Sequence, residues 1–444
     1  MKKLAFLILL ATLCGCSSDE PVLPDEQPSI SDNLYLEFNQ WVYSEMNRQY
    51  LWRDDLPDSL ECNYDLAPRD FFKSLLSAKD RFSYFTSNPG YSRSATENLG
   101  FEYQLVKDTE GNEWMYVLYV TSPQAELNGI HRGDLIKRIA NNTYVKGTVN
   151  QSNSTIIEGE VIEWSDNSSY AQKSSVLLDS IYVTESKKIG YLCYLEYSDT
   201  RDLDKPLKRF SDSGIDELIL DLRYNPGGYV STCRYLCNCI IPVSAYSQMF
   251  QQCSYNDILA KRYLEETGNE RTFTYFMDQP EPGQELLGEN LYPLNLSKIY
   301  VLTSKHTASA SEATIICLRP YMDVIVIGEQ TIGKGVGSWT ISDSRFQYAI
   351  QPITMRYYNA AGETTPDEGL VPDVHVADGY STSKKNIGDT QEPLLKVALS
   401  LISTGTYAAE PPGRSSSKFE IPLTPVGEPS YITDYKKRLH NEGI

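Results

Sequence analysis

Apolar side chains recur at intervals of three and four residues in the N-terminal part of the chain, once its first thirty residues are set aside. The apolar positions of this first series are Leu34, Phe38, Trp41, Val42, Met46 and Tyr50. A second group follows Pro68 and ends near residues 80–82; it consists of Phe71, Phe72, Leu75 and Leu76. This spacing is typical of helices with one buried face. We therefore expect residues 31–88 to form a small helical domain that packs on the rest of the protein.

The pattern changes to alternation in the next segment. Apolar and polar residues alternate over residues 102–106, which favours a strand with one buried face. Gly129, Gly133 and Asp134, which are residues common in turns, follow farther along. Residues 89–180 are therefore predicted to form a β-rich module.

A third pattern, in which strands and helices alternate, begins near residue 185. Residues 215–223 read as a buried strand, and residues 229–241 as a helix that Pro242 ends. Between them, a turn with two glycines allows backbone N–H groups to approach a ligand closely. A plain connecting turn or a phosphate loop are the alternatives, and the phosphate loop lacks its spaced glycines and its Gly-Lys-Ser/Thr ending. The sequence thus predicts an α/β core over residues 185–402, followed by a C-terminal extension over residues 403–444.

Two residues of this core suggest covalent chemistry. Ser309 and Lys334 are 25 residues apart, with an apolar strand at residues 324–328 between them. Ser309 and Glu312 form a capping box at the start of a helix, which directs free N–H groups and the positive end of the helix dipole at that point. A serine hydroxyl becomes a nucleophile when a base removes its proton, and a lysine can be that base if burial keeps its amine neutral. Lys334 on an exposed turn is the simpler alternative.

Taken together and in this order, these stretches resemble the C-terminal processing peptidases, also called tail-specific proteases. Further matching stretches are residues 190–192, 221–228, 307–312, 328–335 and 368–373. The resemblance covers most of the chain, and it implies that residues 89–180 are a PDZ-like module and that the α/β core has the crotonase/Clp-like architecture. In that module it makes residues 122–129 a helix and Gly133-Asp134 the turn into a strand.

The same resemblance implies the roles of particular residues. It makes Ser309 the nucleophile and Lys334 its general base. The backbone N–H groups of an oxyanion hole would come from Gly227 or Gly228 and from Ala310. Many family members carry a glutamine four positions after the lysine, which orients it; this chain has Ser338 there, so a serine would be the orienting residue. Leu99, Gly100 and Phe101 correspond to a loop that binds the terminal carboxylate of a peptide.

The first residues read as a targeting segment and lie outside the fold. Lys2 and Lys3 precede an apolar run over residues 4–13, which is too short to span a bilayer as a helix. The run ends at Cys14-Gly15-Cys16, which resembles a bacterial lipobox with Cys16 as the lipidated residue. Residues 1–16 are then the signal peptide and residues 17–30 a tether. We expect a lipid-anchored protein of the bacterial cell envelope, at the outer membrane and exposed on the surface; an ordinary secretory signal is the alternative.

Composition narrows the classes of function. A net charge of −19 would repel phosphate and argues against nucleic-acid binding. Seven cysteines remain once Cys14 and Cys16 are set aside, and an odd number leaves at least one thiol unpaired. Cys233, Cys237 and Cys239 are expected to pack in the core. Among the four histidines, His306 is the rival base for Ser309. No His, Cys or carboxylate cluster has the spacing of a metal site, so we expect neither metal nor cofactor.

The sequence therefore predicts a serine endopeptidase with a Ser/Lys dyad, which cleaves proteins of the envelope or the extracellular space. Its partners would be protein or peptide substrates, recognised through their C-termini, and the membrane that holds the lipid anchor. A non-catalytic peptide-binding lipoprotein on the same scaffold is the main alternative, and Ser338 is the feature in its favour. An esterase or amidase acting on a small substrate would need the same dyad without the PDZ-like module.

Overall fold

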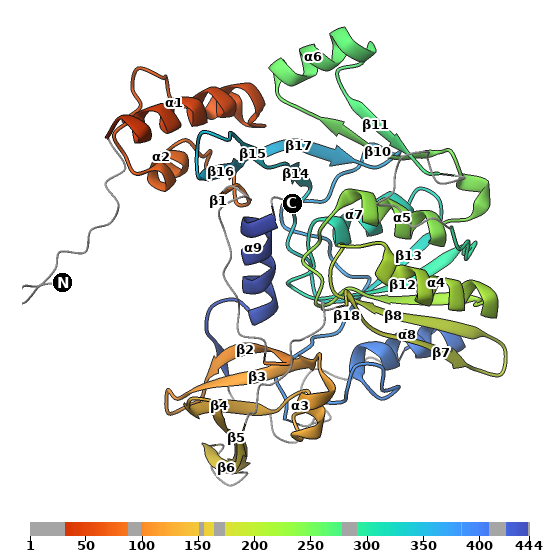
Figure 1. Cartoon of the computed structure of the whole chain (residues 1–444). Helices are drawn as coiled ribbons and strands as arrows, with labels where there is room; N and C mark the ends of the chain where they lie inside the picture. Colours follow the sequence, from red (N-terminus) through yellow and green to blue (C-terminus); the bar gives the residue numbers. More distant parts are fainter. Residues whose placement is uncertain are drawn as a thin grey trace, which may run out of the picture.

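The computed structural model describes residues 32–87, 99–150, 155–163, 174–277, 291–382, 384–407 and 423–442. Within them the strands form two six-stranded sheets and two smaller ones. Figure 1 shows the arrangement of the elements: helices α1 and α2 at the top, a mixed α/β core in the middle, and a β-rich module at the bottom. Helix α9 (Ser430–Glu442) stands between the module and the upper part of the molecule.

The core is a six-stranded sheet of order β18-β13-β12-β9-β8-β7. Its strands are β7 (Val176–Val183), β8 (Lys188–Tyr194), β9 (Glu217–Asp221), β12 (Lys298–Thr303), β13 (Asp323–Gly328) and β18 (Val374–His375). All neighbours pair in parallel except β7, which runs antiparallel to β8. Parallel strands are normally buried on both faces, which explains why β9 and β13 read as continuous apolar runs in the sequence.

Helices cover both faces of this sheet. One apolar cluster joins it to α4 (Arg201–Ser213), α5 (Val230–Ile240) and α7 (Ala310–Leu318), and a second joins the other face to α8 (Pro393–Thr404). Side chains of β8 alternate between the two clusters, with Leu192 in the first and Tyr191 in the second. The strands and helices predicted at residues 215–223, 229–241, 309–317 and 324–328 are thus confirmed. The cysteines of α5 pack in the first cluster as expected, and the seven described cysteines are all unpaired.

The N-terminal region does form helices, α1 (Asp32–Gln49) and α2 (Pro68–Ser74), with a 3-10 turn η1 (Arg53–Asp55) between them. Its core is shared with the rest of the protein, because Phe38 and Phe72 pack with Phe346 and Ile350. The strand β1 (Tyr84–Ser87) then pairs with β16 (Tyr348–Gln351), which also pairs with β15 (Ile341–Ser342). The region is therefore attached to the core by a shared sheet as well as by apolar contacts.

A four-stranded sheet of order β11-β10-β17-β14 lies beyond the core helices. Its members are β10 (Met249–Ser254), β11 (Thr272–Tyr275), β14 (Val336–Ser338) and β17 (Ile353–Tyr358). The 3-10 turn η2 (Val243–Ala245) precedes β10, and α6 (Asp257–Thr267) joins β10 to β11. Its strand β14 follows directly on the β13–β14 loop, which contains Lys334, and pairs with β17.

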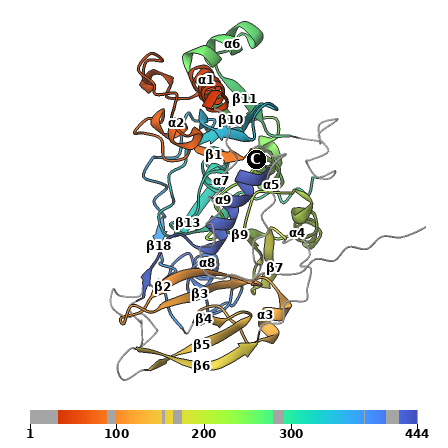
Figure 2. The same cartoon turned by 60° about the vertical axis from the view of Figure 1, so that its left-hand side comes forward.

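The β-rich module is a six-stranded sheet of order β19-β2-β3-β4-β5-β6, with the short helix α3 (Pro123–Leu127) beside it (Figure 2). Its strands are β2 (Phe101–Lys107), β3 (Glu113–Val120), β4 (Leu135–Ala140), β5 (Thr143–Asn150), β6 (Thr155–Glu163) and β19 (Thr424–Pro425). Two of the predicted boundaries need correction. The limit at residue 180 falls inside β7, which belongs to the core sheet, and β19 comes from the C-terminal extension. Both differences arise from strand pairing between segments that are distant in sequence.

Candidate active site

Ser309 lies in a strained turn between β12 and α7. Its backbone has φ 58° and ψ −115°, outside the regions that non-glycine residues normally adopt. It occupies the N-cap position of α7, and the residue remains partly exposed. Strain of this kind persists only where the surroundings hold it in place, and it gathers at functional sites. The local geometry therefore agrees with the functional role that its sequence motif suggests.

Glu312 is the group that holds this turn. Its buried carboxylate accepts hydrogen bonds from the backbone N–H groups of Ser309 at 2.8 Å, Gly333 at 2.7 Å and Lys334 at 2.8 Å. The hydroxyl of Thr331 donates a fourth. Burial raises the pKa of Glu312, while these hydrogen bonds act in the opposite direction. Because Ser309 and Lys334 donate to the same carboxylate oxygen, their amide nitrogens lie within about 5.6 Å of each other.

Tyr357 of β17 joins the same two residues from the carbonyl side. Its buried hydroxyl lies 3.0 Å from the carbonyl oxygen of Lys334 and 3.4 Å from that of Ser309. A third neighbour, the hydroxyl of Thr365, lies 3.1 Å away. One carboxylate and one phenol thus fix the backbone of the predicted nucleophile relative to that of the predicted base. The sequence analysis identified neither role.

The environment of Lys334 favours a neutral amine. Burial lowers the pKa of Lys334, against the carboxylates of Glu312 and Asp80, which raise it. Lys436 of α9 adds a smaller lowering effect. Within the described residues, the Lys334 amine has neither an ion-pair nor a hydrogen-bond partner, and its Nζ lies 5.6 Å from the centre of the Phe82 ring. A lysine in such surroundings is suited to accept a proton.

Two residues of the N-terminal region contact the loop that carries Lys334. The guanidinium of Arg81 donates to the carbonyl oxygen of Gly333 at 2.9 Å and to that of Asp367 at 2.7 Å. The centre of the Phe82 ring lies 4.8 Å from this guanidinium and 5.6 Å from the amine of Lys334. The N-terminal helical region therefore forms part of the wall of the site, which its predicted role as a packing domain did not include.

The glycine turn after β9 lies directly against Ser309. A Cβ atom added to Gly227, whose φ is 111°, would come within 2.7 Å of the Ser309 Cβ, so a side chain is excluded there. The Gly227 N–H already donates to the side-chain oxygen of Asn225 at 2.9 Å. In the described part of the chain, the N–H groups of Gly228 and Ala310 have no such partner. Of the three predicted oxyanion donors, these two remain available, and Gly227 provides space.

A buried network of charges holds the segment that leads into this turn. Arg223 donates to both carboxylate oxygens of Glu392 at 2.6 and 3.0 Å, and to Asp221 at 2.9 Å. In the same network, Arg132 of the module binds Asp378 at 2.7 Å. An unpaired charge would be costly in this environment, so the mutual pairing fixes the position of the turn. The network also links the module to the core.

Ser338 does not contact the lysine. Its hydroxyl accepts a hydrogen bond from the side chain of Gln351 at 3.0 Å, and Gln351 in turn accepts one from Thr340 at 2.8 Å. The orienting role expected for Ser338 has no support in this geometry. The contacts that Lys334 does make are those of its backbone with Glu312 and Tyr357 and that of its amine with the Phe82 ring.

His306, the rival base, has other contacts. Its ring lies edge-on to Tyr431 of α9, with ring centres 6.2 Å apart. Burial lowers the pKa of His306 to about 4, and the neighbouring Lys305 contributes to the same effect. No interaction joins His306 to the Ser309 side chain among the described residues.

The pH dependence of activity is expected to distinguish the two bases. If Lys334 is the base, it must lose its proton before it can act, so activity should rise as the pH passes through its pKa. A His306 base would instead place the rise near the pKa of about 4. The measurement is the initial rate of peptide cleavage against pH for the wild type and His306→Ala. A rise near pH 4 in the wild type that His306→Ala removes together with the activity would replace Lys334 by His306.

A second variant tests which charges control that rise. The charged groups facing Lys334 are Glu312, Asp80 and Lys436. Asp80→Asn removes a carboxylate that raises the pKa of Lys334, and we therefore expect the rise in activity to move to lower pH. An unchanged or higher midpoint in Asp80→Asn, with wild-type circular dichroism, would contradict this assignment.

The predicted peptide-binding residues are separate from this cluster. Leu99, Gly100 and Phe101 lie at the start of β2, and Gly100 has φ 71° with no room for a Cβ beside the Ser122 hydroxyl. Residues 88–98, which precede Leu99, lie outside the described residues. The predicted helix is present as α3, with Ser122 as its N-cap. Cys16, the predicted lipidation site, also lies outside the described residues.

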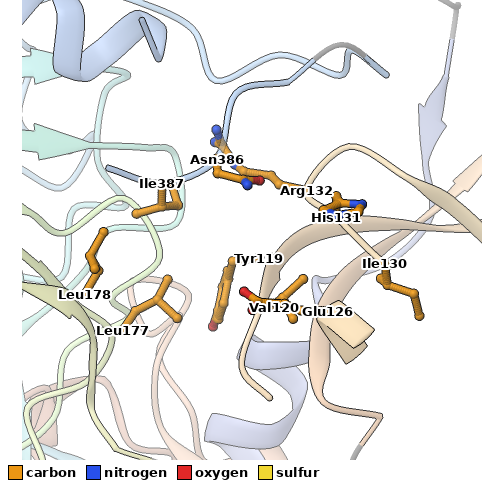
Figure 3. Close-up of a pocket in the computed structure, with 10 residues that line it drawn as sticks. All are labelled: Tyr119, Val120, Glu126, Ile130, His131, Arg132, Leu177, Leu178, Asn386 and Ile387. Carbon is orange, nitrogen blue, oxygen red and sulfur yellow. The ribbon is translucent and has the colours of Figure 1, made fainter. Parts of the chain in front are cut away.

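A cavity of about 230 Å³ lies between the module and the core (Figure 3). Its lining contains neither Ser309 nor Lys334 and consists of Tyr119, Val120, Glu126, Ile130, His131, Arg132, Leu177, Leu178, Asn386 and Ile387. In the described ranges, no cluster of three or more His, Cys, Asp or Glu could hold a metal ion. No described helix has the length and apolar character needed to cross a membrane.

Comparison with known proteins connects this site to one family. Residues 188–376 match the model of peptidase family S41, and residues 37–84 match the peptidase S41 N-terminal domain. A solved S41 protease structure from Bacteroides fragilis aligns with a TM-score of 0.69 and 25% identity, over 83% of this chain and 98% of that one.

Two curated proteins are similar over shorter lengths. The chloroplastic carboxyl-terminal-processing peptidase 1 of Arabidopsis thaliana is 24% identical over 285 residues, which is 59% of this chain and 53% of that protein. The carboxy-terminal processing protease CtpB of Bacillus subtilis is 25% identical over 170 residues, 37% of this chain and 30% of that protein. The chain thus matches about half or less of the length of these relatives.

Proposed function

Because the chain belongs to peptidase family S41, we propose that it is a serine endopeptidase in which Ser309 attacks the peptide carbonyl and Lys334 removes the serine proton. The observation that carries the proposal is the shared carboxylate of Glu312, which binds the backbone N–H groups of both residues. The strained backbone of Ser309 and the lowered pKa of Lys334 support the same assignment. No third residue is needed to relay the proton.

Each group then has a defined part in the reaction. The neutral amine of Lys334 takes the proton of the Ser309 hydroxyl, and the serine oxygen forms a bond to the peptide carbonyl carbon. The resulting oxyanion would accept hydrogen bonds from the N–H groups of Gly228 and Ala310 at the positive end of α7. The protonated lysine returns its proton to the leaving amine as the peptide bond breaks. Water then hydrolyses the acyl-enzyme by the same steps in reverse.

The proposed substrates are unfolded or extended polypeptides of the cell envelope. Figures 1 and 2 show α9 running between the module and the N-terminal region, beside the α/β core. The PDZ-like module would add recognition of the substrate's C-terminus. Lipidation of Cys16 would keep the enzyme at the outer membrane, facing such substrates.

A non-catalytic peptide-binding protein is the second candidate. The observation in its favour is that Ser338, at the position of the family's orienting glutamine, bonds to Gln351 and does not contact Lys334. The buried amine of Lys334 and the contacts of Glu312 and Tyr357 with its backbone favour the enzyme, because a binding protein has no need of them.

Digestion of a reduced, unfolded protein such as casein tests the proposal. The purified chain from residue 32 onward is expected to generate new termini, detected by mass spectrometry, within hours at pH 8. Ser309→Ala should generate none, which also excludes a contaminating protease. Binding of the substrate without cleavage by the wild type would establish the second candidate.

Lipidation of Cys16 is expected to hold the full-length protein in the membrane fraction of expressing bacteria. Cys16→Ser removes the thiol that would be acylated, so it should shift the protein to the soluble fraction and abolish labelling by a radioactive fatty acid. Wild-type protein without label would show that the leader is an ordinary secretory signal.

A further inference from the structure

The outer edge of β2 in the module is covered by the chain's own C-terminal segment. β19 pairs antiparallel with β2, with Thr424 opposite Lys107 and Pro425 opposite Val106. The backbone N–H of Val426 continues the pairing and donates to the carbonyl oxygen of Leu105 at 2.8 Å. The segment therefore runs along β2 toward the Leu99–Phe101 end of the strand.

Two side chains extend this contact to the start of β2. Gln104 donates to the carbonyl oxygens of Val426 at 3.0 Å and Gly427 at 3.3 Å. At the next position, the backbone N–H of Tyr103 donates to the Ser430 hydroxyl at 2.7 Å, and that hydroxyl donates to Glu102. Residues 424–430 thus cover the edge of β2 from Lys107 to Tyr103 and occupy the carbonyl oxygen of Leu105 and the N–H of Tyr103. An external peptide that adds a strand to this edge needs the same groups.

The cover is short and makes few ladder hydrogen bonds. β19 contains two residues, and Pro425 has no N–H to donate. Pro429 likewise cannot donate before the chain turns into α9. An extended peptide with an N–H at every position would make more backbone hydrogen bonds along the same edge. The segment is therefore built to be exchanged more easily than a regular strand.

The first turn of α9 connects this segment to the catalytic site. Immediately after Ser430, the ring of Tyr431 packs against the rings of Tyr119 in β3 and Tyr224 in the glycine turn, with ring centres 6.0 and 5.8 Å away. His306, which precedes Ser309 by three residues, lies 6.2 Å from the same ring. Farther along α9, Lys436 affects the pKa of Lys334. The first turn of α9 thus contacts both segments that flank the proposed oxyanion hole.

From these contacts we infer that the β2 edge is a docking surface for an extended segment of a polypeptide substrate, and that residues 424–430 compete with that segment for it. The inference rests on the proposed function for the nature of the ligand. The incoming strand would run antiparallel to β2, as residues 424–426 do, with its end toward Leu99. Its arrival displaces residues 424–430 and with them the contacts of Tyr431. Docking on the module is in this way linked to the arrangement of the Tyr224–Gly228 turn.

Two opposite variants test the competition. Val426→Pro removes the N–H that bonds to Leu105 and should open the edge, while Val426→Ala keeps that N–H and is the matched control. Lys107→Cys combined with Thr424→Cys places two thiols on directly opposed, exposed positions, within the distance range of a disulfide. Oxidation then closes the edge, and reduction reopens it in the same protein.

Binding is measured by fluorescence anisotropy in the Ser309→Ala background, with a fluorescein-labelled ten-residue peptide ending in valine, as the free acid and as the amide. We expect Val426→Pro to bind the peptide about 3- to 10-fold more tightly than Val426→Ala, the effect of one net backbone hydrogen bond. The oxidised double-cysteine protein should bind more weakly than its reduced form by at least that factor. Preference for the acid over the amide would place the peptide's carboxylate at the Leu99–Phe101 end.

Equal binding by the oxidised and reduced forms, including no binding by either, would overturn the inference. If Val426→Pro does not fold, as judged by circular dichroism, the double-cysteine protein decides alone, since it is compared with itself. Because Ser309→Ala cannot cleave by the proposed mechanism, this assay is independent of the catalytic assignment. If casein is not digested but the peptide still binds more weakly to the oxidised than to the reduced double-cysteine protein, the peptidase assignment is refuted and the docking edge is retained.

Discussion

Ser309→Ala and Lys334→Ala are each expected to reduce the rate of proteolysis by a factor on the order of 10⁴ to 10⁶, without loss of the folded state. The two side chains act on a single proton, so removing either should stop the same step. The double variant should consequently be no slower than the slower single variant. The rates are measured with a quenched fluorescent peptide, and folding is measured by thermal unfolding.

Lys305→Ala is the matched control for the lysine. Lys305 is exposed and lies close to Ser309 in sequence, so its removal changes the charge near the site without touching the proposed base. Its activity should stay within about two-fold of the wild type, as for a surface substitution. Cleavage by Ser309→Ala at the wild-type rate would eliminate this serine as the nucleophile. Additive losses in the double variant would show that Lys334 acts in a different step.

Glu312→Gln is expected to have the second largest effect, on both activity and stability. An amide has one acceptor oxygen in place of two, and its NH₂ group would face N–H donors from Ser309, Gly333 or Lys334. Each buried donor that loses its partner costs about 1–3 kcal/mol, so the free energy of unfolding should fall by roughly 2–5 kcal/mol. The rate should fall at least a hundred-fold, because the backbones of Ser309 and Lys334 lose their common anchor.

Glu368→Gln provides the comparison for this carboxylate. Glu368 is exposed on the loop that packs against Thr331, and its side chain takes no part in the clamp. Both the unfolding free energy and the rate should remain close to those of the wild type. A Glu312→Gln protein with full activity would show that the carboxylate serves only as a helix cap, the simpler role that its sequence position suggests.

Local signals in the sequence predicted the elements that carry the site but not the contacts between them. The capping box identified the start of α7, and the double glycine identified the turn beside it. The contact of Glu312 with residues 333 and 334 was not visible, because a helix and the strand β13 separate them. The sequence signal that could have revealed this contact is a carboxylate within an otherwise apolar helix, since a buried carboxylate needs hydrogen-bond donors from elsewhere in the chain. Arg81 gave no signal, since an arginine at the end of a helical region is ordinarily exposed.

The orienting role of Ser338 stays a prediction that came from the family resemblance. Its place four residues after Lys334 suggested an orienting group, but β14 continues from the loop and places the Ser338 hydroxyl beside Gln351 of β16. Register between strands decides which side chains meet, and a shift of one position reverses the face on which each lies. Such pairing between distant strands is set by the packed sheet as a whole.

The sequence by itself determined the order of elements, the strand–turn–helix segments around Gly227 and Ser309, and the presence of one serine and one lysine at a spacing typical of the family. These features depend on local backbone preferences and apolar periodicity, which act over a few residues. The tertiary structure alone decided that Glu312 and Tyr357 clamp the two residues, that Phe82 borders the amine, and that residues 424–430 cover the module's edge. The physical reason is that hydrogen-bond partners and desolvation are fixed only when segments far apart in the chain pack together.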